Sequence, residues 1–352
     1  MSVNSWRASP RNHKPAVLGQ PIHESSAWYP KDFENNECWI YSLNDAEVGE
    51  VLDAADATQA RGIELMDIRK DAFRLPTLAG PLADIRDELI FGRGFVLIRG
   101  LPVAGRTREQ IARAFWGVGA HLGRAVSQNG RGQLLGHVTD LGGDYGKVRG
   151  YMTRAHMSFH ADRSDFLALC CLHPAKSGGA HRICSSVTLY NEMLKSRPDL
   201  VQELTYRFYR FRSGELRPGE TKPWYRQPVF SVTDGYFAAR GASAAIAKMK
   251  QVAEIPPLTA AQEEAIALYK STAATIALDI NYQPGDISVV QNHVTLHSRS
   301  AFEDWPEVER KRHLLRLWLS TDGAYPVCED IEKEIRGVTV EGTKLRASLE
   351  VA

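Results

Sequence analysis

Apolar positions in the first third of the chain follow helical spacing, interrupted by one short run that is wholly apolar. After Asn44-Asp45, apolar residues at 48, 51, 52 and 55 fall three and four positions apart, which predicts an amphipathic helix. Similar spacing predicts two further helices, one over 81–91 and one over 109–122 with Thr107 as its cap. Between them, the apolar run 95–98 is flanked by glycines, which is typical of a buried strand.

From position 133 onward the pattern changes to short β-rich runs separated by glycine and other turn residues. The predicted strands cover 134–138, 165–172, 182–187, 229–232, 275–280, 287–291 and 313–320. Two helical stretches interrupt them, at 189–194 and 259–270. Many short strands in one half of a chain favour a jelly roll, with the helical first half packed against it as a buttress. We therefore predict an α+β, mainly β fold with a double-stranded β-helix core, consisting of an N-terminal arm over 1–40 and a single jelly-roll domain over 41–352.

Composition excludes several classes of protein. The chain has 352 residues, 43% hydrophobic and 24% charged, which argues against disorder. Its 43 basic and 42 acidic residues give no basic surplus, so nucleic acid is not expected as a partner. The longest apolar run, 166–172, is far too short to span a bilayer, and the polar start lacks a secretory signal. Five cysteines without C-x-x-C spacing indicate a reduced, cytoplasmic setting, and no heptad or self-complementary motif decides whether the chain forms a homo-oligomer.

Several common catalytic motifs are missing from the sequence. It contains no G-x-x-x-x-G-K-[ST] phosphate loop, no H-E-x-x-H zinc helix and no G-x-S-x-G nucleophile elbow. Two glycine clusters, over 117–123 and 130–136, have one residue too many for the dinucleotide fingerprint and do not lie between a strand and a helix. Nicotinamide binding is therefore not expected.

The strongest local signal for chemistry is His160-Ala161-Asp162. In an extended or turn conformation, side chains at i and i+2 point the same way, so this imidazole and carboxylate can reach one metal ion. The motif is short, however, and a surface histidine beside an acidic turn is the simpler reading of it alone.

A further histidine could complete a metal site. His293 and His297 follow the predicted strand 287–291, and either could join His160 and Asp162 as a third ligand. Two histidines and one carboxylate on one face of an ion are the ligand set of non-haem Fe(II) oxygenases. The alternative for each histidine is a structural, hydrogen-bonded role. Asn292 is expected either to orient a ligand or to make an ordinary hydrogen bond at the strand end.

The predicted strand near the C-terminal end carries two arginines on one face. Alternation places Arg312, Leu314, Arg316 and Trp318 on one side and an apolar core face on the other. A buried guanidinium needs a carboxylate, from the protein or from a ligand. Protein acids such as Asp304 or Glu307 are the alternative partners to a bound ligand.

His160, Asp162, His297 and Arg312, in this order, resemble the motif of Fe(II)/2-oxoglutarate-dependent dioxygenases, in particular the TauD/TfdA group, named for taurine and aryloxyacetate oxidation. Fourteen residues separate His297 from Arg312, at the upper end of the group's spacing. Three further stretches are similar to bacterial and fungal members of the group: 94–102, 172–179 and 284–286. The likeness covers about residues 85–320.

The resemblance implies a role for each of these residues. His160, Asp162 and His297 would bind Fe(II), and Arg312 would hold the distal carboxylate of the cosubstrate 2-oxoglutarate. The group often places Thr or Ser after Gly-Gly-x as a second contact to that carboxylate, but His181 stands there in this chain. The presence of Asp162 argues against a halogenase, in which a small residue replaces the carboxylate.

The implied reaction consumes 2-oxoglutarate and O₂, releases succinate and CO₂, and hydroxylates an unactivated C–H bond of a small organic substrate. Arg316 occupies the place that holds the substrate's anionic group in taurine oxidation, so an anionic substrate is expected. The resemblance places further candidate substrate-binding residues near the pocket: Gln128, Asn129, Tyr151, Arg154 and His156.

Two other classes of function remain open from the sequence. A catalytically silent jelly-roll module could bind an anionic small molecule in the same cavity. A zinc hydrolase could use the same three ligands, although that reading leaves Arg312 unexplained and offers no evident general base.

Overall fold

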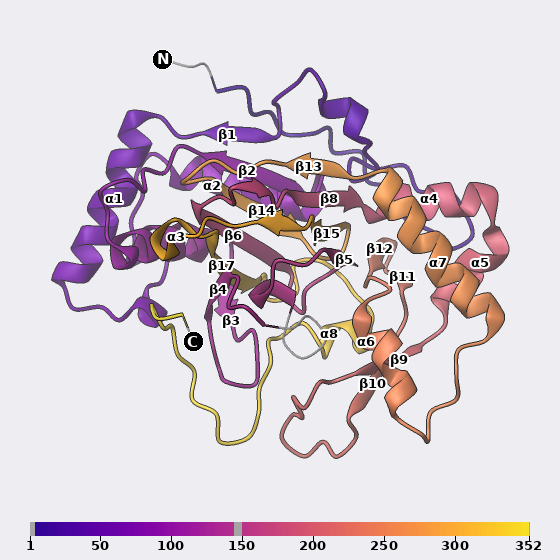
Figure 1. Ribbon diagram of the computed structural model, residues 1–352. Helices are drawn as coiled ribbons and strands as arrows, with labels where there is room; N and C mark the ends of the chain where they lie inside the picture. The colour runs from indigo at the N-terminus through magenta and orange to yellow at the C-terminus, as the bar shows by residue number, and fades with distance from the viewer. Residues whose placement is uncertain (1–3, 144–149, 352) are drawn as a thin grey trace.

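The computed structural model describes residues 4–143 and 150–351 and shows two facing β-sheets with helices outside them (Figure 1). The larger sheet has seven strands in the order β1-β2-β14-β6-β17-β3, and β4 also pairs with β17. Its strands are β1 (Ile40–Ser42), β2 (Phe95–Arg99), β3 (Arg124–Val126), β4 (Leu135–Thr139), β6 (Phe166–His173), β14 (Ile287–Gln291) and β17 (His313–Ser320). The predicted strands 287–291 and 313–320 are confirmed at both ends.

The smaller sheet has four strands in the order β13-β8-β15-β5. They are β5 (Met157–His160), β8 (His181–Ser185), β13 (Leu278–Ile280) and β15 (Thr295–Arg299). Three two-stranded ribbons complete the β-structure: β7 (Ser177–Gly178) with β16 (Phe302–Glu303), β9 (Phe208–Phe211) with β10 (Trp224–Gln227), and β11 (Phe230–Thr233) with β12 (Tyr236–Ala239). The predicted double-stranded β-helix core with flanking helices is confirmed.

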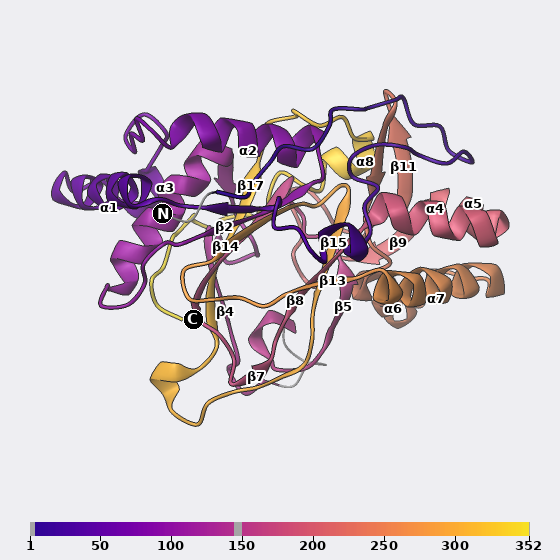
Figure 2. The same ribbon diagram turned by 90° about the horizontal axis from the view of Figure 1, so that it is seen from above.

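Three N-terminal helices cover the outer face of the larger sheet, as predicted. They are α1 (Asp45–Ala60), α2 (Ala79–Phe91) and α3 (Arg108–Leu122). Asn44 and Thr107 each form a capping box, with a side-chain oxygen that accepts from the backbone N–H three residues later. Figures 1 and 2 show these helices together on one side of the molecule, where α2 packs on β2 and β14 and α3 packs on β17.

A second group of helices lies against the smaller sheet, on the opposite side of the molecule (Figure 2). It contains α4 (Ser186–Ser196), α5 (Pro198–Thr205) and α7 (Ala260–Thr275), with the short α6 (Ala244–Ala247) and α8 (Glu329–Glu332) nearby. Short 3-10 turns cover η1 (Pro30–Phe33), η2 (Leu65–Asp67), η3 (Gly150–Met152), η4 (Lys248–Gln251) and η5 (Val308–Arg310). The core of this half is aromatic, with Tyr190 edge-on to Phe230 and 5.1 Å from the ring of Phe237.

Two strands predicted from the sequence extend into residues that are helical, and three others, 134–138, 165–172 and 229–232, are each shifted by one residue. The predicted strand 182–187 ends at Ser185, because the Ser185 hydroxyl accepts from the N–H of Thr188 and begins α4. The predicted strand 275–280 is shortened at its start, because α7 continues through Thr275 and β13 begins at Leu278. Helix α4 begins directly after β8, and only residues 276–277 separate α7 from β13.

The two faces of β17 lie in different cores, as the alternation predicts. Leu315, Leu317 and Leu319 belong to the core shared with the N-terminal helices. Leu314 and Trp318 belong to a second core, between the sheets. Arg316 lies on this second face, and Arg312 directly precedes β17. Both arginines point toward the smaller sheet, where they line one cavity.

The N-terminal arm is fastened to the body at several points. The Trp28 indole donates to the carbonyl of Arg93 at 2.9 Å, and the Gly19 N–H donates to the Tyr190 hydroxyl at 2.8 Å. Residues 1–3 of the predicted arm lie outside the described residues, and the division at position 40 stays a prediction.

Within the described chain, no helix is both long and apolar enough to cross a membrane.

Candidate metal centre

Two strands of the smaller sheet and the residues that follow one of them bring three metal-ligating side chains together. The antiparallel register of β5 and β15 places His297 opposite His160, and their ring centroids are 4.2 Å apart. Asp162 lies two residues beyond the end of β5, with its Oδ1 3.8 Å from His160 Nε2 and its Oδ2 3.7 Å from His297 Nε2. One ligand atom from each of the three residues lies within 4.8 Å of the others.

The protonation of both histidines suits a divalent metal. His160 Nδ1 lies 2.9 Å from the carbonyl of Ser158, which places its proton on Nδ1 and leaves the Nε2 lone pair toward Asp162. Burial, and then the electrostatic influence of the neighbouring His160 and His181 side chains, hold the pKa of His297 well below its usual range, so His297 is neutral. Two imidazoles and one carboxylate match the facial ligand set of non-haem Fe(II) sites.

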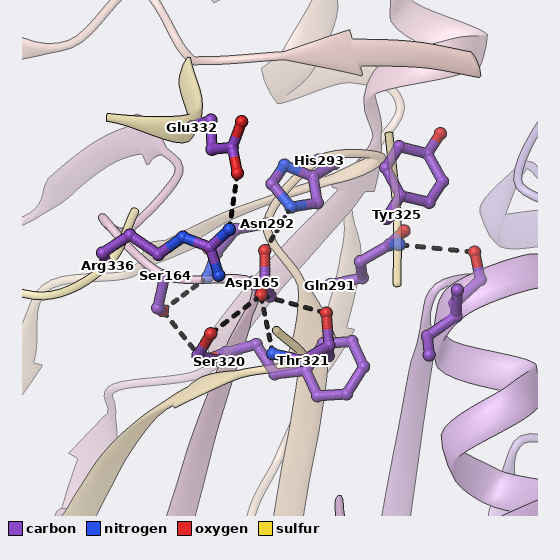
Figure 3. Close-up of polar contacts among 12 residues, drawn as sticks. Ser164, Asp165, Gln291, Asn292, His293, Ser320, Thr321, Tyr325, Glu332 and Arg336 are labelled. Carbon is purple, nitrogen blue, oxygen red and sulfur yellow. Dashed lines mark hydrogen bonds and ion pairs between the residues drawn. The ribbon is translucent and has the colours of Figure 1, made fainter. Parts of the chain in front are cut away.

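His293, the alternative third ligand, has a structural role. It is fully buried, and its Nε2 lies 2.9 Å from Asp165 Oδ1. Figure 3 shows Asp165 between the His293 ring and the Ser320–Thr321 segment, whose Thr321 N–H donates to Oδ2 at 2.7 Å. Although burial favours the neutral acid, the bonds from His293 and Thr321 keep the pKa of Asp165 below its usual value. This cluster joins the start of β6 to the end of β17.

Arg312 is buried near the metal-ligating residues without a carboxylate partner. Its side chain is 4% exposed, lies over the ring of Phe302 and donates from Nη2 to the carbonyl of Gly179 at 3.4 Å. Nη1 has no partner among the described residues. Asp304, one of the alternative partners, accepts from the backbone N–H of Arg312, and Glu307 pairs with Arg310 instead. Within 4–143 and 150–351, Arg312 therefore makes no ion pair with an acidic side chain.

His181 presents an uncharged nitrogen to the cavity that the three metal-ligating residues line. Its Nδ1 lies 2.7 Å from the Tyr282 hydroxyl and 3.2 Å from the Ser288 hydroxyl, while Nε2 is buried and without a partner. Burial, and then the charge of Arg312, lower the pKa of His181 to about 3. When these hydroxyls donate to Nδ1, the single proton of the neutral ring lies on Nε2.

Arg316 is held by aromatic rings and an amide. Its guanidinium lies over the ring of Tyr151 at 4.3 Å, and Nε donates to Gln128 Oε1 at 2.6 Å. Gln128 is fixed in turn, because its Nε2 donates to the backbone carbonyls of Leu134 and Arg316. The predicted residues Gln128 and Tyr151 therefore lie beside Arg316, and Tyr151 also lines the cavity.

The structure places the other predicted substrate residues in different surroundings. Asn129 is buried and donates to Gln133 Oε1 at 2.6 Å, beside a smaller recess that also reaches Tyr151 and Arg316. Arg154 and His156 are exposed and are not among the residues that line the central cavity. Their roles in substrate binding stay predictions.

One cavity joins the metal-ligating residues to the two arginines. Its walls include His160, Asp162, His181, His297, Arg312 and Arg316, with Val138, Leu167 and Leu169 as an apolar side.

Sequence reasoning missed two residues that hold Asp162: the Trp318 indole donates to Oδ2, and Arg240 donates to the Asp162 carbonyl. The alternation of β17 indicates that Trp318 faces the cavity, but no sequence signal connects Arg240 to it.

Comparison with protein families gives one match over most of the chain. Residues 57–318 match the family described as taurine catabolism dioxygenase TauD, TfdA family. FR-33289 synthase of Streptomyces rubellomurinus is 32% identical over 323 residues, covering 87% of this chain and 92% of that protein. The taurine hydroxylase-like protein SAT17 of Stachybotrys chartarum is 27% identical over 325 residues, covering 87% of this chain and 81% of that protein.

Solved structures share the fold at lower identity. Asparagine oxygenase in complex with Fe(II), hydroxyasparagine and succinate has a TM-score of 0.62 and 20% identity, covering 80% of this chain and 94% of that one. The non-haem iron oxygenase OrfP with Fe and α-ketoglutaric acid has a TM-score of 0.62 and 16% identity, with the same coverage.

Proposed function

The chain belongs to the TauD, TfdA family of dioxygenases, and from that premise we propose that the central cavity oxidises a small anionic molecule. The protein is an Fe(II)- and 2-oxoglutarate-dependent oxygenase, and its reaction hydroxylates an unactivated C–H bond. 2-Oxoglutarate and O₂ are consumed, and succinate and CO₂ are released. This reaction class replaces both alternatives left open by the sequence, the silent binding module and the zinc hydrolase.

We propose His160, Asp162 and His297 as the Fe(II) ligands. Their converging ligand atoms and the neutral state of His297 support this assignment. When bound, the iron supplies the redox chemistry that activates O₂ and attacks the C–H bond. The chain's own contribution would be to hold the ion with these three side chains and to leave its other positions to cosubstrate and O₂.

Arg312 and His181 are the proposed contacts for the distal carboxylate of 2-oxoglutarate. Arg312 is a buried cation without a protein carboxylate, and such a group is stabilised by a ligand anion. His181 offers an N–H from Nε2 without adding a second positive charge. In this pocket a neutral imidazole takes the place of the hydroxyl that the group often uses.

Arg316 is the proposed contact for an anionic group of the substrate. Gln128 and Tyr151 hold its guanidinium in one orientation, which lowers the entropic cost of binding an anion there. Solved relatives bind small molecules, hydroxyasparagine in asparagine oxygenase and hydroxyarginine in OrfP. The apolar side formed by Val138, Leu167 and Leu169 helps to exclude water from the reacting C–H bond.

The single observation that carries the proposal is the buried, acid-free Arg312 in one cavity with His160, Asp162 and His297. The test measures succinate formation with Fe(II), O₂ and 2-oxoglutarate while small carboxylates, sulfonates and phosphonates are screened. We expect one class of anion to stimulate succinate release, and Arg316→Ala to raise the KM for that anion. Stimulation by a neutral compound that Arg316→Ala leaves unchanged would contradict the anionic assignment.

A further inference from the structure

Asp162 is fastened to the protein at three points besides its proposed metal. Its backbone N–H donates to Asn292 Oδ1 at 2.9 Å, and its backbone carbonyl accepts from Arg240 Nη2 at 2.6 Å. Its carboxylate Oδ2 accepts from the Trp318 indole at 2.7 Å. The three partners come from three different parts of the chain: the β14–β15 turn, the segment after β12, and β17.

The backbone contacts restrict where Asp162 can go but leave its side chain free to turn. Asn292 is itself fixed, because its amide donates to the Ser164 hydroxyl and its backbone N–H donates to the carbonyl of Asp165 (Figure 3). Arg240 is buried and also donates to the carbonyl of Asn292. The remaining freedom of Asp162 is rotation of its carboxylate, which would change whether Oδ1 or Oδ2 faces the metal.

Trp318 removes this remaining freedom. It is 4% exposed on the central strand β17, where it pairs with Leu167 of β6 and Val126 of β3. An indole has one N–H, is uncharged and does not serve as a metal ligand. The N–H of Trp318 donates to Asp162 Oδ2, while the face of its ring lies 5.4 Å from the Arg316 guanidinium. The sheet register therefore fixes the position of the hydrogen-bond donor.

We propose that Trp318 is a positioning residue that binds Oδ2 of Asp162 and so presents Oδ1 as the single metal-binding oxygen. This inference rests on the proposed role of Asp162 as an iron ligand. A bidentate carboxylate would take a second position on the ion and close a site that 2-oxoglutarate or O₂ needs. Partners that orient a metal ligand typically change metal affinity 10- to 100-fold when they are removed.

The first test compares Trp318→Phe with the wild type for anaerobic Co(II) affinity in the presence of 2-oxoglutarate. Phenylalanine keeps an aromatic ring in the core but lacks the N–H. We expect Co(II) to bind about 10- to 100-fold more weakly. Trp224→Phe is the matched control, because the Trp224 indole also donates to a carboxylate, Glu254 at 3.2 Å, at an exposed position away from the cavity. Its Co(II) affinity is expected to equal that of the wild type.

A double-mutant cycle separates positioning from general packing. If Trp318 acts through the Asp162 carboxylate, Trp318→Phe has no further effect on Co(II) affinity in an Asp162→Ala background. An equal loss in both backgrounds, or an unchanged affinity in folded Trp318→Phe, would overturn the inference. Failure of the wild type to bind Co(II) at all would instead overturn the proposed function.

A spectroscopic measurement on the wild type does not depend on the folding of any variant. The indole N–H resonance of Trp318 is expected to be strongly protected from solvent exchange and to shift when Zn(II) and 2-oxoglutarate saturate the protein. The other six tryptophans provide internal references. An indole N–H of Trp318 that exchanges rapidly, or that does not move on saturation with Zn(II), would overturn the inference.

Discussion

Individual side chains in the cavity are selected as much for their charge state as for their position. Burial keeps His181 and His297 neutral, so they can offer a donor and a lone pair without adding to the charge of two nearby arginines. Arg312 remains a buried cation without a carboxylate partner within the described chain. The buried positive charge of Arg312 is therefore compensated only when an anion binds in the cavity.

Arg312→Ala is expected to raise the KM for 2-oxoglutarate by about 100-fold, because a charge-assisted contact to a carboxylate in a buried site is lost. Steady-state succinate release at varied 2-oxoglutarate measures this effect. Arg310→Ala is the matched control, since Arg310 is half exposed, pairs with Glu307 and lies over Trp305. Equal KM values for Arg312→Ala and the wild type would show that the carboxylate binds elsewhere.

The stability of the protein is expected to depend on pH through a histidine pair outside the cavity. His313 Nε2 lies 2.9 Å from His137 Nδ1, and burial, followed by the charge of His137, lowers the pKa of His313 to about 3. The unfolded chain takes up a proton near pH 6.5, whereas the folded chain does so only near pH 3. The contribution of His313 is therefore full above pH 6.5 and falls as the pH drops toward 3, by up to about 1.4 kcal/mol per pH unit.

Urea unfolding between pH 7 and pH 5 measures this dependence. We expect His313→Gln to have a shallower pH dependence than the wild type. His23→Gln, at an exposed position of the N-terminal arm, is expected to keep the wild-type slope. The same slope in His313→Gln and the wild type would show that His313 already titrates near its ordinary pKa when folded.

At the scale of elements, the β5–β15 pairing is the step that turns separate motifs into a site. His160 and Asp162 are close in sequence, but His297 reaches them only because the two strands pair in this register. The sequence predicts β14, β17 and the three N-terminal helices well, since their apolar patterns are long and regular. It misses β5 and β15, because their short mixed runs contain the polar residues of the site and lack a regular alternation.

The same reasoning explains which site residues were predictable. His160, Asp162, His297 and Arg312 stand in a recognisable order along the chain. The choice of His297 over His293 could not be made from the sequence, because it depends on the pairing of His293 with Asp165 in the folded protein. Arg240 was not predictable, because its contact with Asp162 is long-range and goes to a backbone carbonyl.

Asp165 connects several elements, and its removal is expected to destabilise the whole fold. Asp165→Ala leaves the buried His293 ring and the N–H of Thr321 without an acceptor, at a cost of about 3 kcal/mol in the free energy of unfolding. Chemical denaturation measures the change. Asp199→Ala, at an exposed carboxylate paired with Arg197, is the control and is expected to change stability by less than about 1 kcal/mol. A stable Asp165→Ala would refute the structural role of the cluster.

At the scale of the whole molecule, the two sheets, with helices outside them, enclose one cavity. The larger sheet carries Arg316 and Trp318, and Arg312 directly precedes its strand β17. In the smaller sheet, β5 carries His160, β8 carries His181 and β15 carries His297 (Figure 1). Ligands that bridge the sheets should therefore stabilise both at once.

Zn(II) together with 2-oxoglutarate is expected to raise the melting temperature by a few degrees. Binding at 100 times the dissociation constant adds about 2.7 kcal/mol to the free energy of unfolding. Differential scanning fluorimetry with each ligand alone and with both ligands measures the shift. His160→Ala is expected to abolish most of it, and a full shift in that variant would place the bound metal elsewhere.

The most direct measurement of the central claim is an anaerobic titration of the protein with Fe(II) and 2-oxoglutarate, followed by visible absorption. The account predicts a charge-transfer band that requires both ligands, saturates at one iron per chain and is lost in His160→Ala. It also predicts that Arg312→Ala retains the band but needs far more 2-oxoglutarate to develop it. An undiminished band in His160→Ala would contradict the claim that His160, Asp162 and His297 hold the iron.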